Sequence, residues 1–206
     1  MRNLEYYVTA PDFIFPSCPE PQQKGMDIYM IYLVRHGQTD WNIEGRNQGH
    51  TDTELNSSGI EQAAQLAQQL KNIDFDYVFS SPLKRAAKTA RIIHSGEIIY
   101  DSRIIERYNG ELEGRTNTSD LIDFSDPNDI RYGVEPLLIF RKRITDFWDE
   151  IISNYVNKNI LIVTHAGVVI YSQAYFKGEP KDGNYRNYKI KNCEILQFDN
   201  SRAMHS

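Results

Sequence analysis

Short blocks of apolar residues alternate along the chain with longer stretches in which apolar side chains recur every three or four positions. The apolar blocks span residues 28–34, 77–79, 98–100, 160–163 and 193–198. A block that is apolar throughout is typical of a strand whose two faces are both covered, as in a parallel sheet. The periodic stretches predict helices over 58–70, 82–96 and 137–155 and another from 168. Strands alternating with helices predict an α/β fold, a three-layer sandwich with a mainly parallel central sheet flanked by helices.

Local signals suggest where these helices begin and which faces they bury. Ser58 and Glu61 have the spacing of a capping box, and Ser81 precedes a proline that suits a first helical position. Trp148 lies on an aromatic face at helical spacing and is expected in the core. The first of these helices is expected to bury Ile60, Ala63, Ala64, Ala67 and Leu70.

The first 25 residues differ from the rest, because four of the eight prolines fall among them. Proline lacks a backbone donor and restricts the residue before it, so neither a helix nor an inner strand is expected there. We therefore divide the chain into a proline-rich arm, residues 1–25, and one domain, residues 26–206. The simplest expectation is an arm that lies on the domain or frays. Two alternatives stay open: it extends a chain that originally began at Met26, or its apolar side chains pack on a partner subunit.

Composition narrows the class of protein. The chain has 206 residues, 40% of them hydrophobic, which is enough for one globular domain with a sizeable core. A net charge of −5 argues against general nucleic-acid binding, and no apolar run approaches the length of a membrane span. The two cysteines form no C-x-x-C pair and no histidine pair has metal-ligand spacing, so no metal is expected. The N-terminal residues do not resemble a secretory signal, so a cytoplasmic location is expected.

Five side chains that suit phosphoryl transfer follow strand-like segments. His36 and His165 each come directly after an apolar strand block, where the ligands of open α/β sheets bind. Arg35 and Arg85 lie close to the same edge and could hold phosphate oxygens. Glu106 follows another strand-like approach, Arg103 to Ile105, and could protonate a leaving group. Each residue alone could have an ordinary structural role, but together they suit catalysis in which an imidazole attacks phosphorus.

Four sequence blocks in order make the chain similar to the histidine phosphatase superfamily, the phosphoglycerate mutase-like proteins. The first block, L-V-R-H-G-Q-T-D-W-N at residues 33–42, matches the family's L-V-R-H-G-x-[ST]-x-x-N. The others are S-S-P-L-K-R-A-A-K-T-A at 80–90, E-R-Y-N-G-E-L-E-G at 106–114 and V-T-H-A-G-V at 163–168. The resemblance covers about residues 28–200 and leaves the N-terminal arm outside.

The resemblance implies a role for each matching residue. His36 would be the nucleophile that becomes phosphorylated, Glu106 the proton donor, and Arg35, Arg85 and His165 would surround the phosphoryl group. A hydrogen bond from the other ring nitrogen of His36 to a backbone carbonyl would fix its tautomer. Further contacts to the substrate would come from Gly37, Thr39, Asn42, Gln48, Gly49, Tyr108 and Ala166. The family's second histidine is often followed by glycine, and here Ala166 keeps the backbone N–H.

The branch of the family is suggested by length. Only about fifty residues separate Gly114 from His165, whereas the cofactor-dependent mutases of this family carry a longer insertion there. The compact form favours a phosphatase that hydrolyses small phosphomonoesters without a cofactor. The alternatives are a phosphoglycerate mutase, which would need 2,3-bisphosphoglycerate, and a non-catalytic protein that binds a phosphorylated ligand.

Substrate choice is expected to depend on the irregular segment 107–134. The expected partner is a small phosphorylated metabolite, with neither nucleic acid nor membrane, and a homo-oligomer is left open. Candidate substrate contacts in this segment are Tyr108, Asn109, Phe124 and Tyr132.

Overall fold

The computed structural model describes residues 7–8, 29–118, 121 and 126–200, so Cys18, Phe124 and nearly all of the proline-rich arm lie outside it. A six-stranded sheet runs through the centre, in the order β1-β6-β2-β5-β3-β4. Strands β2, β5, β3 and β4 are parallel, and β6 and β1 extend the sheet on the β2 side with antiparallel pairings. The strands are β1 (Tyr7–Val8), β2 (Met30–Arg35), β3 (Tyr77–Ser80), β4 (Ile99–Tyr100), β5 (Ile160–Thr164) and β6 (Ile195–Asp199).

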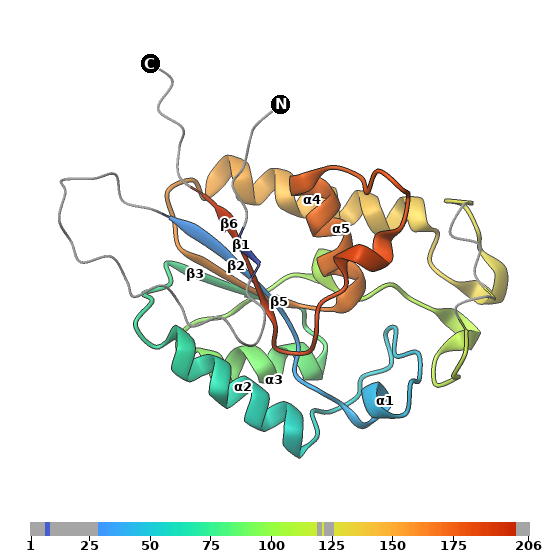
Figure 1. Cartoon of the computed structure of the whole chain (residues 1–206), viewed down its shortest axis with the longest axis horizontal. Coiled ribbons are helices and arrows are strands. Elements are labelled where there is room, and N and C mark those ends of the chain that lie inside the picture. The colour runs from blue at the N-terminus through green and yellow to red at the C-terminus, as the bar shows by residue number, and fades with distance from the viewer. Residues whose placement is uncertain (1–6, 9–28, 119–120, 122–125, 201–206) are drawn as a thin grey trace.

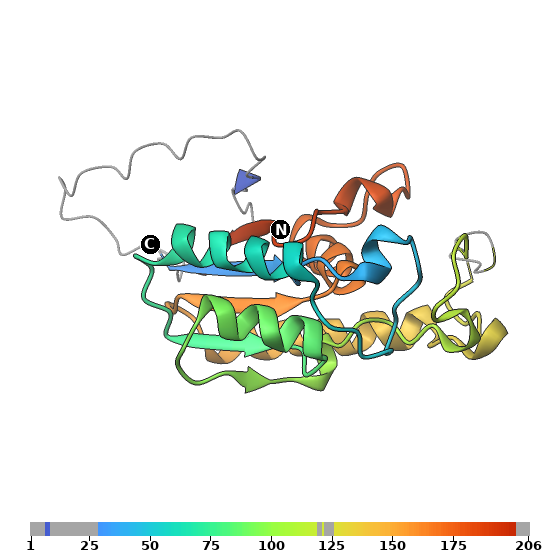
Figure 2. The ribbon, with the colours of Figure 1, turned by 90° about the horizontal axis from the view of Figure 1, so that it is seen from below.

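Helices cover both faces of this sheet, which confirms the predicted sandwich. Figure 1 shows α2 (Ser57–Leu70) and α3 (Lys84–Ile93) on one side, and α4 (Leu137–Asn154) and α5 (Ala166–Lys177) on the other. Figure 2 shows α2 and α3 along the same face from below. The short α1 (Asp40–Ile43) follows β2. Four 3-10 turns lie in the connections: η1 (Ser102–Ile104), η2 (Gly110–Leu112), η3 (Arg131–Gly133) and η4 (Tyr185–Tyr188).

The core forms two layers because β2 and β5 are buried on both faces. Ile31 pairs with Ile160 and Val34 with Val163, and all four side chains are fully buried. One layer packs against α4 and α5 and the other against α2 and α3. Trp148 lies fully buried in the first layer, where its indole N–H donates to Ser172 Oγ at 2.8 Å. The expected core role of Trp148 is therefore confirmed, with the hydrogen bond that a buried indole requires.

The start of α2 differs from the predicted capping box. Asn56 caps the helix, because its extended backbone lets the side chain accept a hydrogen bond from the Gly59 N–H at 2.8 Å. The helix therefore begins at Ser57 rather than at the capping box of Ser58. Its buried face is also shifted: Leu66 is buried, whereas Ile60 is 39% exposed.

Two further local predictions were wrong, one because of a distant residue and one because of a neighbouring side chain. Ser81 does not cap α3; the Lys84 N–H at the helix start donates instead to Asp52 Oδ1 at 2.7 Å. The segment before Glu106 is the 3-10 turn η1 and not a strand, because Asp101 accepts a hydrogen bond from the Arg103 N–H and closes the turn. In the part of the chain that the model describes, no helix is long and apolar enough to cross a membrane.

Candidate active site

The carboxyl ends of β2 and β5 bring the two histidines together. Arg35 pairs with Thr164 as the last residues of the two parallel strands, and the His36 N–H donates to the Thr164 carbonyl at 2.8 Å. The rings of His36 and His165 then face each other with centroids 5.2 Å apart. The matching sequence positions of the two histidines therefore correspond to one site at one edge of the sheet.

His36 is held as a neutral imidazole, and one of its ring nitrogens is already used in a hydrogen bond to the backbone. Its Nδ1 lies 2.7 Å from the Gly37 carbonyl, an acceptor, so Nδ1 carries the hydrogen and Nε2 keeps its lone pair. Burial lowers the pKa of His36 well below its usual value, and the positive charges of Arg85 and Arg35 lower it further. The residue is 3% exposed. A neutral imidazole with a free lone pair on Nε2 can act as a nucleophile at neutral pH.

His165 lies deeper and is also neutral. Its Nε2 and Ser81 Oγ are 2.7 Å apart, while Nδ1 is buried with no hydrogen-bond partner among the described residues. Burial lowers the pKa of His165 well below its usual value, and Arg85 lowers it further. Ser81, expected as a helix cap, thus orients the second histidine.

Two arginines place positive charge beside His36. Arg85 is fully buried, and its two terminal nitrogens donate to the carbonyls of Thr51 at 2.8 Å and Gly49 at 2.7 Å. Burial lowers the pKa of Arg85 to about 10, which leaves it charged at neutral pH. Arg35 donates to the Ile190 carbonyl at 2.8 Å. The Nε atom of each arginine is buried without a hydrogen-bond partner in the described structure.

The carboxylate of Glu106 is fixed by two backbone amides. Oε1 accepts from the Arg107 N–H at 2.9 Å, and Oε2 accepts from the Gly167 N–H at 3.1 Å. A Cβ atom at position 167 would lie 2.3 Å from Glu106 Oε1 and 3.1 Å from the ring of Phe140. Glycine at 167 therefore permits the close approach of the first turn of α5 to the carboxylate.

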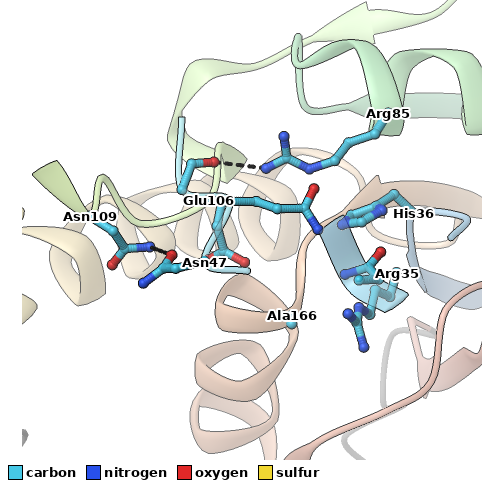
Figure 3. A pocket seen from close by; sticks show the side chains of 10 residues that line it. Arg35, His36, Asn47, Arg85, Glu106, Asn109 and Ala166 are labelled. Carbon is cyan, nitrogen blue, oxygen red and sulfur yellow. Dashed lines mark hydrogen bonds between the residues drawn. The ribbon is translucent and has the colours of Figure 1, made fainter. Parts of the chain in front are cut away.

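His36, Arg35, Arg85 and Glu106 line a small pocket of about 140 Å³, whereas the predicted catalytic residue His165 is fully buried and does not line it. Figure 3 shows Arg85, His36 and Arg35 along one side and Asn47 and Asn109 on the opposite side. Eight of the residues expected at the site line it: Arg35, His36, Asn42, Gln48, Gly49, Arg85, Glu106 and Ala166. Among the described residues, no group of three or more His, Cys, Asp or Glu side chains is placed to hold a metal ion.

Three expected substrate contacts do not line the pocket. The Gly37 N–H donates to Thr89 Oγ1, and a Cβ at 37 would lie 2.5 Å from the Gly59 carbonyl oxygen. Thr39 is fully buried and caps α1, where it forms a reciprocal capping box with the third helical residue. Tyr108 packs its ring against His50, with centroids 5.1 Å apart, and is 43% exposed. Gly37, Thr39 and Tyr108 therefore contact neighbouring parts of the fold and do not face the pocket.

Of the other expected contacts in segment 107–134, only Asn109 lines the pocket. Tyr132 is 38% exposed on η3 and does not line it, and Phe124 lies outside the described residues.

Asn42 is oriented by hydrogen bonds that the sequence did not reveal. Its Oδ1 accepts from the Thr39 N–H at 3.1 Å, the Thr39 hydroxyl at 3.2 Å and Asn192 Nδ2 at 3.3 Å. Asn192 Nδ2 also donates to the His36 carbonyl at 2.8 Å. The oxygen of Asn42 is thus fully used, which leaves its Nδ2 to donate into the pocket. Asn192 lies 156 residues beyond His36 in the sequence, and no local spacing signals this contact.

Glu113 connects the two loops that form the far side of the pocket. Its Oε1 accepts from the backbone N–H groups of His50 at 2.8 Å and Asn109 at 3.1 Å. Its Oε2 accepts from the Thr51 N–H at 2.8 Å and the Thr51 hydroxyl at 2.6 Å. Because Arg85 donates to the Thr51 carbonyl, Glu113 helps to fix the arginine as well. Glu113 lies within the block at 106–114, so its position could have drawn attention to it, whereas the pocket residue Asn47 lies outside the four blocks.

Comparison with known proteins agrees with this geometry. Residues 31–203 match the histidine phosphatase superfamily (branch 1). A broad-specificity phosphatase of Saccharomyces cerevisiae is 33% identical over 177 residues, covering 80% of this chain and 75% of its own. A phosphoglycerate mutase-like protein of Arabidopsis thaliana is 35% identical over 170 residues, covering 72% of each chain. The crystal structure of Entamoeba histolytica phosphoserine phosphatase in complex with 3-phosphoglyceric acid is 28% identical, with a TM-score of 0.70 and coverage of 85% of this chain and 98% of its own. The chain therefore belongs to the histidine phosphatase superfamily.

Proposed function

We propose that this protein is a phosphatase that hydrolyses small-molecule phosphomonoesters through a phosphohistidine at His36. The observation that carries the proposal is the state of His36: a neutral ring with Nδ1 bonded to the Gly37 carbonyl, between two charged arginines. A neutral Nε2 beside positive charge suits attack on phosphorus, because the cations attract the phosphoryl oxygens and favour the unprotonated ring.

In the first step, His36 Nε2 attacks phosphorus and the bond from phosphorus to the ester oxygen breaks. Glu106, in its protonated form, gives its proton to the departing oxygen and becomes a carboxylate. The phosphorylated ring is cationic, and its Nδ1–H keeps the hydrogen bond to the Gly37 carbonyl. Arg35 and Arg85 hold the equatorial phosphoryl oxygens as charge redistributes.

In the second step, water replaces the ring on phosphorus. The Glu106 carboxylate takes a proton from the water, whose oxygen attacks phosphorus while the bond to Nε2 breaks. Phosphate leaves, His36 returns to the neutral ring and Glu106 is protonated again. The backbone amides of Arg107 and Gly167 keep the carboxylate aimed throughout.

The remaining polar groups complete the phosphoryl site. Asn42 Nδ2 and the Ala166 N–H, at the first residue of α5, are further donors for phosphoryl oxygens. His165 is assigned as a donor through Nδ1, the nitrogen that its contact with Ser81 leaves unpaired among the described residues. A buried donor without a partner is costly, and a bound phosphoryl oxygen would satisfy it.

The proposal requires neither a metal nor an organic cofactor. A mutase would require 2,3-bisphosphoglycerate to prime His36 by phosphorylation, and the short segment between Gly114 and His165 favours hydrolysis instead. The expected ligand is a small phosphorylated metabolite, and the expected location is the cytoplasm.

The test is hydrolysis of 4-nitrophenyl phosphate in buffer with excess chelator. We expect turnover by the wild-type protein and a loss of at least 10³-fold in the His36→Ala variant, because the nucleophile is removed. His94→Ala is the matched control, since His94 follows α3 outside the pocket. Activity that needs a divalent metal would contradict the proposed mechanism, as would full activity in His36→Ala.

A further inference from the structure

We propose that the leaving group of the natural substrate is uncharged and carries hydroxyl groups, as in a sugar or polyol phosphate. The inference rests on the proposed function and concerns the side of the same pocket that faces away from the phosphoryl site. Two amide side chains, Asn47 and Asn109, line that side, and a third, Gln48, also lines the pocket; we refer to the three as the amide wall.

Both cations of the pocket are used at the phosphoryl end. Arg35 and Arg85 lie on the same side of the pocket as His36 (Figure 3), and their charges lower its pKa. Within the described chain, no other arginine and no lysine lines the pocket. A carboxylate or second phosphate on the leaving group would therefore leave water without meeting a cation of its own, which is costly.

The amide wall instead offers neutral donors and acceptors. Asn109 Nδ2 donates to Asn47 Oδ1 at 2.7 Å, and Asn47 Nδ2 donates to Thr118 Oγ1 at 3.3 Å, which fixes the orientation of both amides. Gln48 Oε1 accepts from the Thr53 hydroxyl at 2.7 Å.

These bonds leave Asn109 Oδ1 as an acceptor and Gln48 Nε2 as a donor, with no other hydrogen bond to either among the described residues. A hydroxyl group can both donate and accept, so the hydroxyl groups of a leaving group could donate to the first atom and accept from the second.

A partly buried negative charge, that of Glu113, adds to the discrimination. Glu113 Oε1 accepts from the Asn109 N–H, and a Cβ on Gly49, which lines the pocket, would lie 2.1 Å from this oxygen. A carboxylate on the leaving group would approach that charge through a single layer of residues. The amide wall therefore selects against anionic leaving groups as well as for neutral ones.

The test compares two substrates with the same three-carbon chain and the same arrangement at the central carbon, sn-glycerol 1-phosphate and D-3-phosphoglycerate. They differ only at the terminal carbon that carries no phosphate, which is a hydroxymethyl group in the first and a carboxylate in the second. We expect kcat/KM for phosphate release to be at least about tenfold higher for sn-glycerol 1-phosphate, since an unpaired charge costs more than a misplaced apolar group. Equal values, or a preference for 3-phosphoglycerate, would overturn the inference.

A positive charge added to the amide wall tests the same inference by changing the protein instead of the substrate. We expect Asn109→Lys to shift the ratio of the two kcat/KM values at least about fivefold toward 3-phosphoglycerate, because the lysine supplies the missing cation. The control is Asn72→Lys, which adds the same charge at an exposed position just beyond α2, before the amino end of β3. An unchanged ratio in Asn109→Lys, or an equal shift in the control, would overturn the inference.

Failure of the inference and failure of the proposed function give different results. If 4-nitrophenyl phosphate is hydrolysed through His36 but 3-phosphoglycerate is the better natural ester, the function stands and the inference is wrong. If none of the three esters releases phosphate, the proposed function is wrong and the inference falls with it.

Discussion

Acidification should destabilise the folded protein through its two active-site histidines. His36 and His165 are 3% and 0% exposed, and burial holds the pKa of each well below 6.5. In the unfolded chain both rings take up protons near pH 6.5, the ordinary pKa of histidine. The unfolded state therefore binds more protons than the folded state below that pH, and stability falls as the pH falls.

The size of the effect follows from this difference in proton binding. With the ring neutral in the folded state throughout, lowering the pH from 7.0 to 5.5 costs about 1.3 kcal/mol for each histidine. The pair therefore accounts for about 2.5 kcal/mol, a large share of the stability of an ordinary domain. Above pH 7 the same two groups cause almost no further change, because both states are then neutral.

The assay is urea unfolding at pH 7.0 and 5.5, with the free energy of unfolding extrapolated to water. His36→Asn should reduce the loss between the two pH values by about 1.3 kcal/mol, and His36→Asn with His165→Asn by about 2.5 kcal/mol. The comparison between proteins cancels the contribution of all other titrating groups. An equal loss in wild type and in the double variant would refute the account, because the rings would then not be held neutral by the fold.

The remaining predictions concern the groups around the nucleophile. Gly167→Ala should lower kcat for 4-nitrophenyl phosphate at least about tenfold while the circular dichroism spectrum stays native, because the new methyl group displaces the Glu106 carboxylate. Glu113→Ala should lower the free energy of unfolding by about 2 kcal/mol, and kcat/KM about tenfold, as the loop that orients Arg85 loosens. The fall of kcat/KM on the acid side should have its midpoint below pH 6.5, since the buried His36 of the free enzyme stays neutral there; a midpoint at or above 6.5 would contradict this.

Much of the fold could be predicted from the sequence because its strongest signals are local. The two buried strands, β2 and β5, are continuous runs of mostly apolar residues. In α4, apolar residues recur at helical spacing over the whole length of the helix, which predicts a helix whatever lies around it. Two errors occurred where a neighbouring side chain closes the turn, Asn56 at α2 and Asp101 at η1, and one where a distant residue decides the local structure. Asp52 meets the start of α3 from a loop 32 residues earlier, which no pattern near Ser81 indicates.

The site divides in the same way. Residues directly after strand ends, His36 and His165, could be placed together because parallel strands end at one edge. The roles of residues that contact other protein groups across folded loops were harder to predict. Thr39 lies in the most specific motif, yet it caps a helix, and Asn192 contacts the backbone of His36 across most of the chain. A motif thus indicates that a residue matters at the site, whereas its direct contact with substrate depends on packing.

The central claim is that His36 itself carries the phosphoryl group. The direct measurement is brief reaction with a ³²P-labelled phosphomonoester, quenching in alkali to preserve phosphohistidine, and identification of the labelled peptide by mass spectrometry. The account predicts one acid-labile phosphate on His36, formed and lost at rates that match turnover and absent in His36→Ala. Label on another residue, or full turnover with no phosphorylated His36 at any reaction time, would contradict it.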